Sequence, residues 1–196
     1  MCAMNDQLRP TVWRTARALA NESRLRFLRA VFESKGTKGV SKLAEELGVS
    51  ISTASIYLRA LNARGLVDVR RESSHVFYGN GKNRSLPEAQ RLQAAFGKLF
   101  ASKHLADEWP SSVIPVLRAY ANARRIEIVK AIAAQGPLSF SGLSAISGIP
   151  ETSLLRHLSI LLAAGVVAHD KHRQYVLVKP KDPLGSALQE ITTSDS

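Results

Sequence analysis

An internal repeat limits the possible folds of this chain more than any other feature of its sequence. The segment 12–25 (VWRTARALANESRL) aligns with 113–126 (VIPVLRAYANARRI) at an offset of 101 residues. One residue is then lost, and the offset of 100 that follows matches two pairs of glycines, Gly48 with Gly148 and Gly65 with Gly165. A chance overlay of apolar residues would not also place glycine on glycine twice. We therefore expect the 196 residues to form one small structural unit twice, and not one large domain.

Apolar spacing, with Gly, Pro and capping residues at the ends, predicts the elements of each copy. In the first copy we expect helices over 12–19, from Asn21 to about Gly36, over 42–47 with Ser41 as N-cap, and over 51–64 with Ser50 as N-cap. The β-rich runs 66–70 and 75–78 are joined by a polar turn, 71–74, and predict a hairpin.

A further helix is expected between the copies, over 87–104, with its apolar side chains on one face. Trp109 and Pro110 are expected to end it. The stretch 183–191 reads as a shortened second version of the same helix.

Two short helices joined by the turn 48–50 and followed by a hairpin are the parts of a winged helix-turn-helix. In that fold the second helix fits the major groove of DNA, and the hairpin reaches the backbone or the minor groove. The helical period places Ala54, Leu58 and Leu61 of the second helix toward the core. It is therefore expected to turn five other side chains outward, those of Ser52, Ser55, Ile56, Arg59 and Asn62.

Three stretches of the first copy resemble a known family. They are LANESRLRFL (19–28), VSKLAEELGVSISTASIYL (40–58) and LNARGLV (61–67). They are similar to the opening helix, the helix-turn-helix and the approach to the wing of ArsR-type transcriptional regulators. The resemblance covers about 17–80 and, more weakly, 118–178. It implies sequence-specific binding of double-stranded DNA, with recognition helices in the major groove and basic wings on the backbone.

The helix between the copies resembles the carboxyl-terminal helix by which ArsR-type proteins pair. The resemblance implies that the two copies pack against each other as an intramolecular pseudo-dimer. We expect a mainly α fold with small β-hairpins (α+β), built as tandem winged helix-turn-helix domains. The first domain is expected over 8–85, the connecting, dimerisation-type helix over 86–108 and the second domain over 109–191.

The resemblance also implies which residues contact DNA in the first copy. Ser52, Thr53 and Ser55 match the base- and phosphate-contacting positions of the family. Tyr57 stands where a histidine is usual, and Ile56 where an arginine is usual. With the basic residues beside this helix and on its wing, the expected contacts are Ser52, Thr53, Ser55, Tyr57, Arg59, Arg70, Arg71 and His75.

The second copy keeps a different part of the same pattern. Arg156 and His157 are the family residues, whereas Leu155 replaces a serine and Glu151 a glutamine. Pro150 replaces the N-cap serine and has no amide hydrogen to donate to a phosphate. The expected contacts here are Thr152, Ser153, Arg156, His157, Lys171 and Arg173.

Charge is unevenly divided between the two halves of the chain. Residues 1–100 hold 17 Lys and Arg against 8 Asp and Glu, whereas residues 101–196 hold 10 against 8. A basic surface suits a polyanion, because each Lys or Arg placed against a phosphate releases condensed counterions. We therefore expect the first domain to dominate DNA binding, on an operator with unlike half-sites.

The sequence gives little support for a metal-binding protein, an enzyme or a membrane protein. Cys2 is the single cysteine, and His104 is the only histidine in 87–104, so we expect no disulfide, metal or cofactor. His169 and His172 have a spacing that two metal ligands could use, but lack further nearby ligands. Phosphate-loop, dinucleotide-binding and nucleophile-elbow motifs are absent, so we expect no enzyme. The first ten residues lack an apolar core, and the longest apolar run, 160–168, is too short to span a bilayer, which predicts a cytoplasmic protein without membrane contact.

One alternative function stays open. Tandem winged helices also serve as protein–protein interaction modules without specific DNA binding. That interpretation is favoured by Ile56, Glu151 and Leu155, which lie on the helix faces expected to contact DNA. A further homodimer is possible beside the pseudo-dimer. The sequence names no small-molecule effector.

Overall fold

The structure of the protein is a computed structural model, and it describes residues 11–34, 36–73, 75–81, 87–101 and 109–194. Three residues of the sequence analysis, Cys2, Ser74 and His104, lie outside the described residues. The helices of the described part are short, and none is long and apolar enough to cross a membrane.

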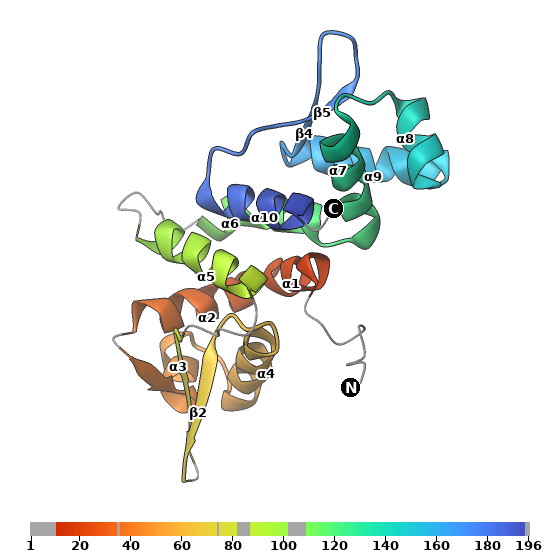
Figure 1. Ribbon diagram of the computed structural model, residues 1–196. Coiled ribbons are helices and arrows are strands. Elements are labelled where there is room, and N and C mark those ends of the chain that lie inside the picture. The colour runs from red at the N-terminus through yellow and green to blue at the C-terminus, as the bar shows by residue number, and fades with distance from the viewer. Residues whose placement is uncertain (1–10, 35, 74, 82–86, 102–108, 195–196) are drawn as a thin grey trace, which may run out of the picture.

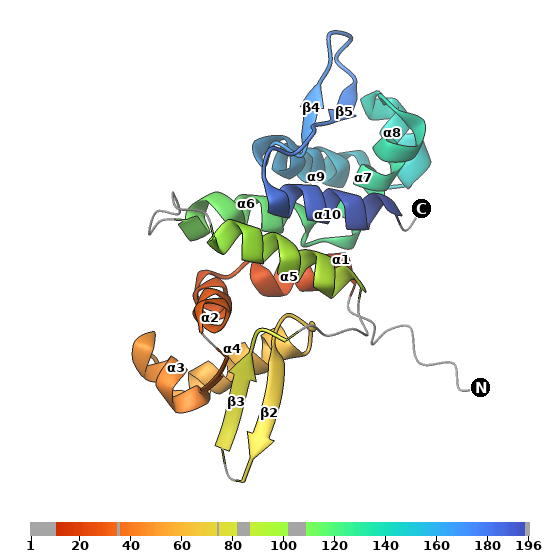
Figure 2. The same cartoon turned by 60° about the vertical axis from the view of Figure 1, so that its left-hand side comes forward.

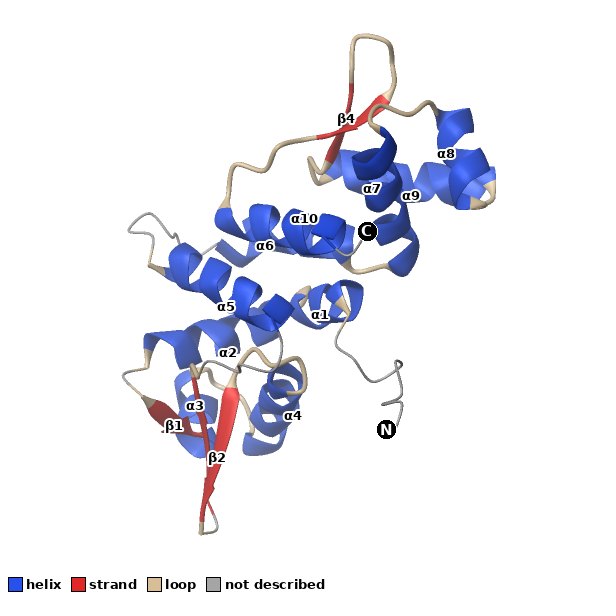
Figure 3. Ribbon diagram, in the orientation of Figure 1, coloured by secondary structure: helices blue, strands red, loops and turns tan. Residues whose placement is uncertain are grey.

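The helices and the hairpin strands follow the same order in both copies, and the first copy has one additional strand between its second and third helices (Figure 3). The first consists of α1 (Val12–Leu19), α2 (Glu22–Glu33), β1 (Thr37–Gly39), α3 (Val40–Glu46), α4 (Ile51–Asn62), β2 (Asp68–Glu72), β3 (His75–Gly79) and α5 (Pro87–Phe100). The second consists of α6 (Trp109–Tyr120), α7 (Ala123–Gln135), α8 (Phe140–Ser147), α9 (Glu151–Ala163), β4 (Val167–His169), β5 (Tyr175–Leu177) and α10 (Pro183–Ser194). The mainly helical fold with small antiparallel hairpins is confirmed.

Corresponding helices of the two copies lie against each other. Helix α1 contacts α6, and α5 contacts α10. Figures 1 and 2 show these four helices in the middle of the molecule, with the hairpins at opposite ends. One cluster of buried apolar side chains runs through both copies and includes Phe96, Leu117 and Leu188. Packing between the copies thus uses the same helices on both sides.

Side chains and glycines mark the helix ends at matched places. Asn21 accepts a hydrogen bond from the amide of Arg24, and Asn122 caps α7 in the same way. Gly48 and Gly148 have φ values of 63° and 60°, a left-handed conformation that residues with a Cβ rarely adopt. The glycine-on-glycine matches of the repeat therefore have a conformational cause.

One arginine of each copy ties its first two helices together. Arg24 donates to the carbonyl of Ala18 at 2.7 Å, and Arg125 donates to those of Ala119 and Arg118 at 2.7 and 2.6 Å. These carbonyls lie at the carboxyl-terminal ends of α1 and α6, where a cation also opposes the negative end of the helix dipole. This arginine, Arg24 in the first copy and Arg125 in the second, thus has a structural role in both.

The prediction that Ser41 caps the third helix is wrong. The N-cap residue of α3 is Gly39, the helix begins at Val40, and Ser41 lies within it. Residues 37–39 form β1, a strand that the sequence analysis did not predict and that pairs with β3 in the order β1-β3-β2. This pairing fixes the chain up to Gly39, so the helix starts two residues earlier than a serine cap would allow.

The prediction that Trp109 and Pro110 end the inter-repeat helix is also wrong. Helix α5 ends at Phe100, and Trp109 and Pro110 are the first, buried residues of α6. Proline fits there because the first turn of a helix has no amide partner to lose. The ring of Trp109 meets that of Phe100 edge-on, with centroids 5.2 Å apart, so it joins the two helices.

Candidate nucleic-acid interface

The first turn of α4 presents a row of small polar groups. The Ser50 hydroxyl accepts a hydrogen bond from the amide of Thr53 at 3.1 Å and lies 2.9 Å from the hydroxyls of both Ser52 and Thr53. Ser50 as N-cap is therefore confirmed. Ser52 is exposed and Thr53 and Ser55 are half-buried, so this end of α4 offers hydroxyl groups at a helix amino terminus, where the helix dipole favours anions.

Both α4 and the hairpin of the first domain carry exposed arginines. Arg59 is exposed and donates to the carbonyl of Ser55 at 3.1 Å, and Arg70 and Arg71 are exposed on β2. Burial raises the pKa of Tyr78, while the charges of Arg59 and Arg71 oppose that rise. The charges of both guanidinium groups, one from α4 and one from the hairpin, thus act on the same phenol of β3.

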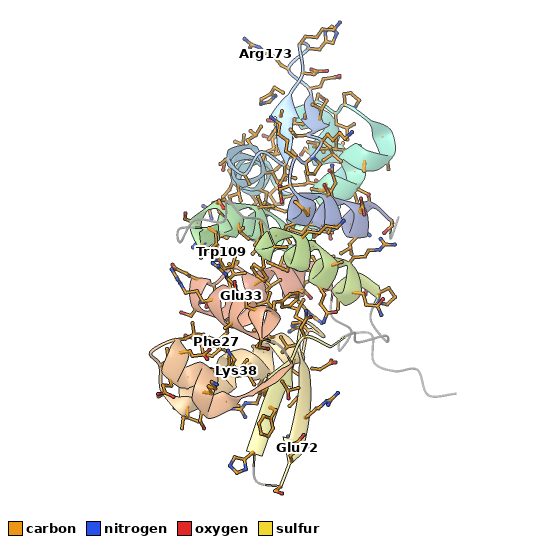
Figure 4. All side chains as sticks on the ribbon, turned by 90° about the vertical axis from the view of Figure 1, so that its left-hand side faces the viewer. Phe27, Glu33, Lys38, Glu72, Trp109 and Arg173 are labelled. Carbon is orange, nitrogen blue, oxygen red and sulfur yellow. The ribbon has the colours of Figure 1, made fainter. Side chains whose placement is uncertain are left out.

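The hairpin of the first copy is longer than its counterpart. Strands β2 and β3 pair from Asp68 opposite Gly79 to Glu72 opposite His75, and His75 is exposed at the start of β3. In the second copy β4 and β5 pair over three residues. Figure 4 places Glu72 and Arg173, near the tips of the two hairpins, at opposite ends of the molecule.

Two residues of α4 lie closer to the core than the sequence analysis expected. Asn62 does not point outward, because its amide donates to the carbonyl of Val67 at 2.8 Å. Tyr57 is half-buried with its ring centroid 5.7 Å from that of Phe27 in α2. The spacing contained this signal, since Asn62 follows the core residue Leu58 by four and Tyr57 follows Ala54 by three. The ring of Tyr57 therefore packs against α2, and only part of its surface is accessible for other contacts.

The first turn of α9 differs in chemistry from that of α4. Pro150 occupies the N-cap position and makes no side-chain hydrogen bond to the helix. Thr152, Ser153 and Arg156 are exposed as expected, but so are Glu151 and Leu155, the latter with 56% of its surface accessible. A carboxylate and a large apolar side chain thus share this face with the arginine.

His157 lies partly inside the second domain. Its Nδ1 atom is buried and has no hydrogen-bond partner among the described residues. Burial lowers the pKa of His157, and the nearby charges of Arg125, Arg156 and Arg124 lower it further. The lowered pKa favours the neutral form of His157 near pH 7 in the free protein.

The second hairpin carries its charges on an ordered turn. The Asp170 carboxylate accepts hydrogen bonds from the amides of His172 and Gln174, both at 2.8 Å. Lys171 and Arg173 are exposed at the tip, and Arg173 has a positive φ of 61°.

Within the described residues no three His, Cys, Asp or Glu side chains come together as a metal site.

The model of the bacterial regulatory protein arsR family matches residues 21–69 and again residues 122–169. The chain carries two ArsR-type helix-turn-helix domains. The first match of the ArsR-type domain runs from the cap of α2 into β2, and the second from the cap of α7 to the end of β4.

A curated relative points the same way for part of the chain. A stretch of 96 residues is 35% identical to the HTH-type transcriptional regulator Rv0324 of Mycobacterium tuberculosis (strain ATCC 25618 / H37Rv). That stretch is 49% of this ArsR-type chain and 39% of the relative, so the chain spans well under half of the relative's length. No solved structure matches the chain.

Proposed function

We propose that this protein is a DNA-binding transcriptional regulator that reads double-stranded DNA with α4 and α9, and that α4 contributes more of the binding. The observation that carries the proposal is the surface of the first ArsR-type domain. There, α4 carries both the hydroxyl-rich first turn and the exposed Arg59, and the charges of Arg59 and of Arg71 on β2 both act on Tyr78. The hydroxyl groups suit base edges or phosphates, and the arginines suit the backbone.

The second domain supports a weaker contribution. Glu151 lies in the first turn of α9, where its charge suits the helix dipole but repels a phosphate. Leu155 occupies the place of Ser55 and offers no hydrogen bond. Arg156, Lys171 and Arg173 remain exposed and supply backbone contacts. We therefore expect the two half-sites of the operator to differ.

The arrangement of the two domains also supports the proposal of a pseudo-dimer. Two-fold dimers of helix-turn-helix proteins present their recognition helices about 34 Å apart, one turn of DNA. Here the contacts of α1 with α6 and of α5 with α10 join two such units within one chain. DNA binding by one chain should therefore not depend on a dimerisation step.

Paired substitutions test the unequal contributions of the domains. Fluorescence anisotropy would compare Arg59→Ala/Arg71→Ala with Arg156→Ala/Lys171→Ala on a duplex enriched from genomic fragments. Both pairs remove two exposed cations, so the change in net charge is matched. We expect the first pair to weaken binding by at least about tenfold, because one charged hydrogen bond contributes that much, and the second pair to weaken it less. Equal losses would contradict the dominance of α4.

A protein–protein interaction module is the second candidate function. The observation that favours it is the exposure of Ile56 and Leu155, 58% and 56%, on the outer faces of α4 and α9. Salt dependence separates the two functions. Phosphate contacts give a log–log slope of about −0.9 for each contact. If the chain does not bind heparin or mixed genomic DNA at low salt, the interaction module is favoured.

A further inference from the structure

A groove in the first domain gathers arginines away from the hydroxyl-rich turn of α4. It lies between α1, the start of α2 and the carboxyl-terminal end of α4, and has a volume of about 450 Å³. Its walls include Trp13 and four arginines, with alanines of α1 and α4 between them; the arginines are Arg14, Arg17, Arg24 and Arg64. The volume is within the range of small-molecule sites.

The described lining of this groove is basic. Among residues 11–194 that the structure describes, no carboxylate lines it, and their ion pairs involve none of Arg17, Arg24 and Arg64. Burial lowers the pKa of Arg64, and the charge of Arg14 lowers it further. The Arg14 guanidinium lies 5.1 Å from the centre of the Trp13 ring. Arg14 and Arg64 thus repel each other, and an anion between them would relieve that repulsion.

The second domain shows that the fold does not require this cluster. The residues that correspond to Trp13, Arg14 and Arg64 are Ile114, Pro115 and Ala164. Only two of the arginines have counterparts, Arg118 and Arg125. Arg125 uses its guanidinium to bond the end of α6, as Arg24 does for α1. The additional arginines of the first domain therefore have no helix-capping role in common with the repeat.

We propose that this groove binds a small phosphate monoester of about mononucleotide size. Such a group carries nearly two negative charges and several acceptor oxygens, and guanidinium groups bind it through paired hydrogen bonds. A carboxylate would neutralise less of the charge of four arginines. The indole of Trp13 and the methyl groups of Ala18, Ala60 and Ala63 offer an apolar wall for the rest of the ligand.

The position of the groove gives the ligand a regulatory role. It contacts α1, which packs against α6 of the other domain, and the end of α4 opposite the hydroxyl-rich turn. A ligand that holds α1 and α4 together therefore changes the position of α4 relative to the second domain. This role rests on the proposed DNA-binding function, whereas binding of the phosphate monoester does not.

Calorimetric titration of the full chain without DNA tests the site. The probes are AMP, inorganic phosphate and adenosine, which shares the base and lacks the phosphate. We expect saturable binding of one AMP, competition by phosphate and no binding of adenosine. Arg17→Gln and Arg64→Ala should weaken AMP binding by at least about tenfold. Arg118→Gln, the matched change in the second domain, should leave it within about twofold.

Two results would overturn the proposal. One is an absence of saturable AMP binding, and the other is an equal loss of affinity in Arg118→Gln. A further arm measures the DNA affinity of the same variants without AMP. If Arg17→Gln and Arg64→Ala lose DNA affinity and the native chain does not bind AMP, the groove holds the DNA backbone instead. If the chain binds AMP but does not bind DNA, the proposed phosphate site is supported and the proposed DNA-binding function is contradicted.

Discussion

The side-chain amide of Asn62 donates a 2.8 Å hydrogen bond to the backbone carbonyl of Val67. Asn62 is the last residue of α4, and Val67 is the buried residue directly before β2. The bond therefore fixes the hairpin to the helix that carries Arg59. The second domain has Leu162 at the corresponding position, so its hairpin follows α9 without such a side-chain hydrogen bond.

Loss of this bond should lower the stability of the first domain. Asn62→Ala leaves the Val67 carbonyl without its side-chain donor, which costs about 1 to 3 kcal/mol in the free energy of unfolding. Urea denaturation followed by circular dichroism measures the change. Asn80→Ala is the control, since Asn80 is exposed and should change the stability by less than about 0.5 kcal/mol. Equal effects would show that the bond does not stabilise the wing.

A buried glutamine holds α5 onto the same region. Gln93 is 6% exposed, and its amide nitrogen lies 3.0, 3.1 and 3.0 Å from the carbonyl oxygens of Gly65, Leu66 and Gly81. Gln93→Leu keeps the volume but leaves these carbonyls without the donor. We expect a loss of about 2 to 3 kcal/mol in a urea titration.

The repeat supplies a control for this change. Gln189 on α10 corresponds to Gln93, is half-buried and makes no side-chain hydrogen bond to another described residue. Gln189→Leu should therefore change stability by less than about 0.5 kcal/mol. A loss as large as that of Gln93→Leu would mean that the amide bonds are not the cause.

Two serines near the helix-turn-helix should respond differently to removal of the hydroxyl. Ser50→Ala removes the N-cap of α4 and should cost about 1 kcal/mol of unfolding free energy. Ser41→Ala should be neutral within about 0.5 kcal/mol, because Ser41 lies inside α3, where alanine has a better helix propensity. Thermal unfolding of both variants under one condition compares them directly. A larger effect at Ser41 would restore it as the cap of that helix.

The stability of the second domain should depend on pH through His157. The pKa of His157 is lowered in the folded state, so the unfolded chain binds a proton more readily. Its contribution is therefore complete above the ordinary histidine pKa of about 6.5 and is lost as the pH falls from that value to the lower pKa of the folded state. Urea denaturation at pH 7.5 and pH 5.5 should show that His157→Gln reduces this loss.

His172 gives the matched control for the pH experiment. It is exposed at the tip of the second hairpin. His172→Gln should leave the difference between the two pH values as it is in the native chain. If His157→Gln retains the full difference as well, the acid sensitivity comes from other groups.

Most of the helices could be read from local sequence. Asn21 and Ser50 cap helices as predicted, because an N-cap depends on the amides of the next three residues alone. Ser41 failed as a cap because β1 pairs with β3, a strand about forty residues away, and that pairing decides where α3 begins. Strands as short as β1 depend on such distant partners.

The candidate interface was predictable in its residue types and less so in its geometry. The exposed positions of Ser52, Arg59, Arg156 and Lys171 follow from helical period and turn position. The packing of Tyr57 on Phe27 and the neutral state of His157 depend on neighbours from other helices. The family pattern assigns these residues to the DNA-contacting helix but does not say how far each side chain is buried.

By itself, the sequence determined that this chain holds two winged helix-turn-helix units, because apolar period, capping residues and matched glycines are all local signals. Tertiary structure alone decided how the units meet, through α1 with α6 and α5 with α10. It also decided that Arg64, at the end of α4, lies beside Arg14 of α1 in one groove. The reason is physical, since charges fifty residues apart in the chain come together only after the apolar faces of their helices have been buried.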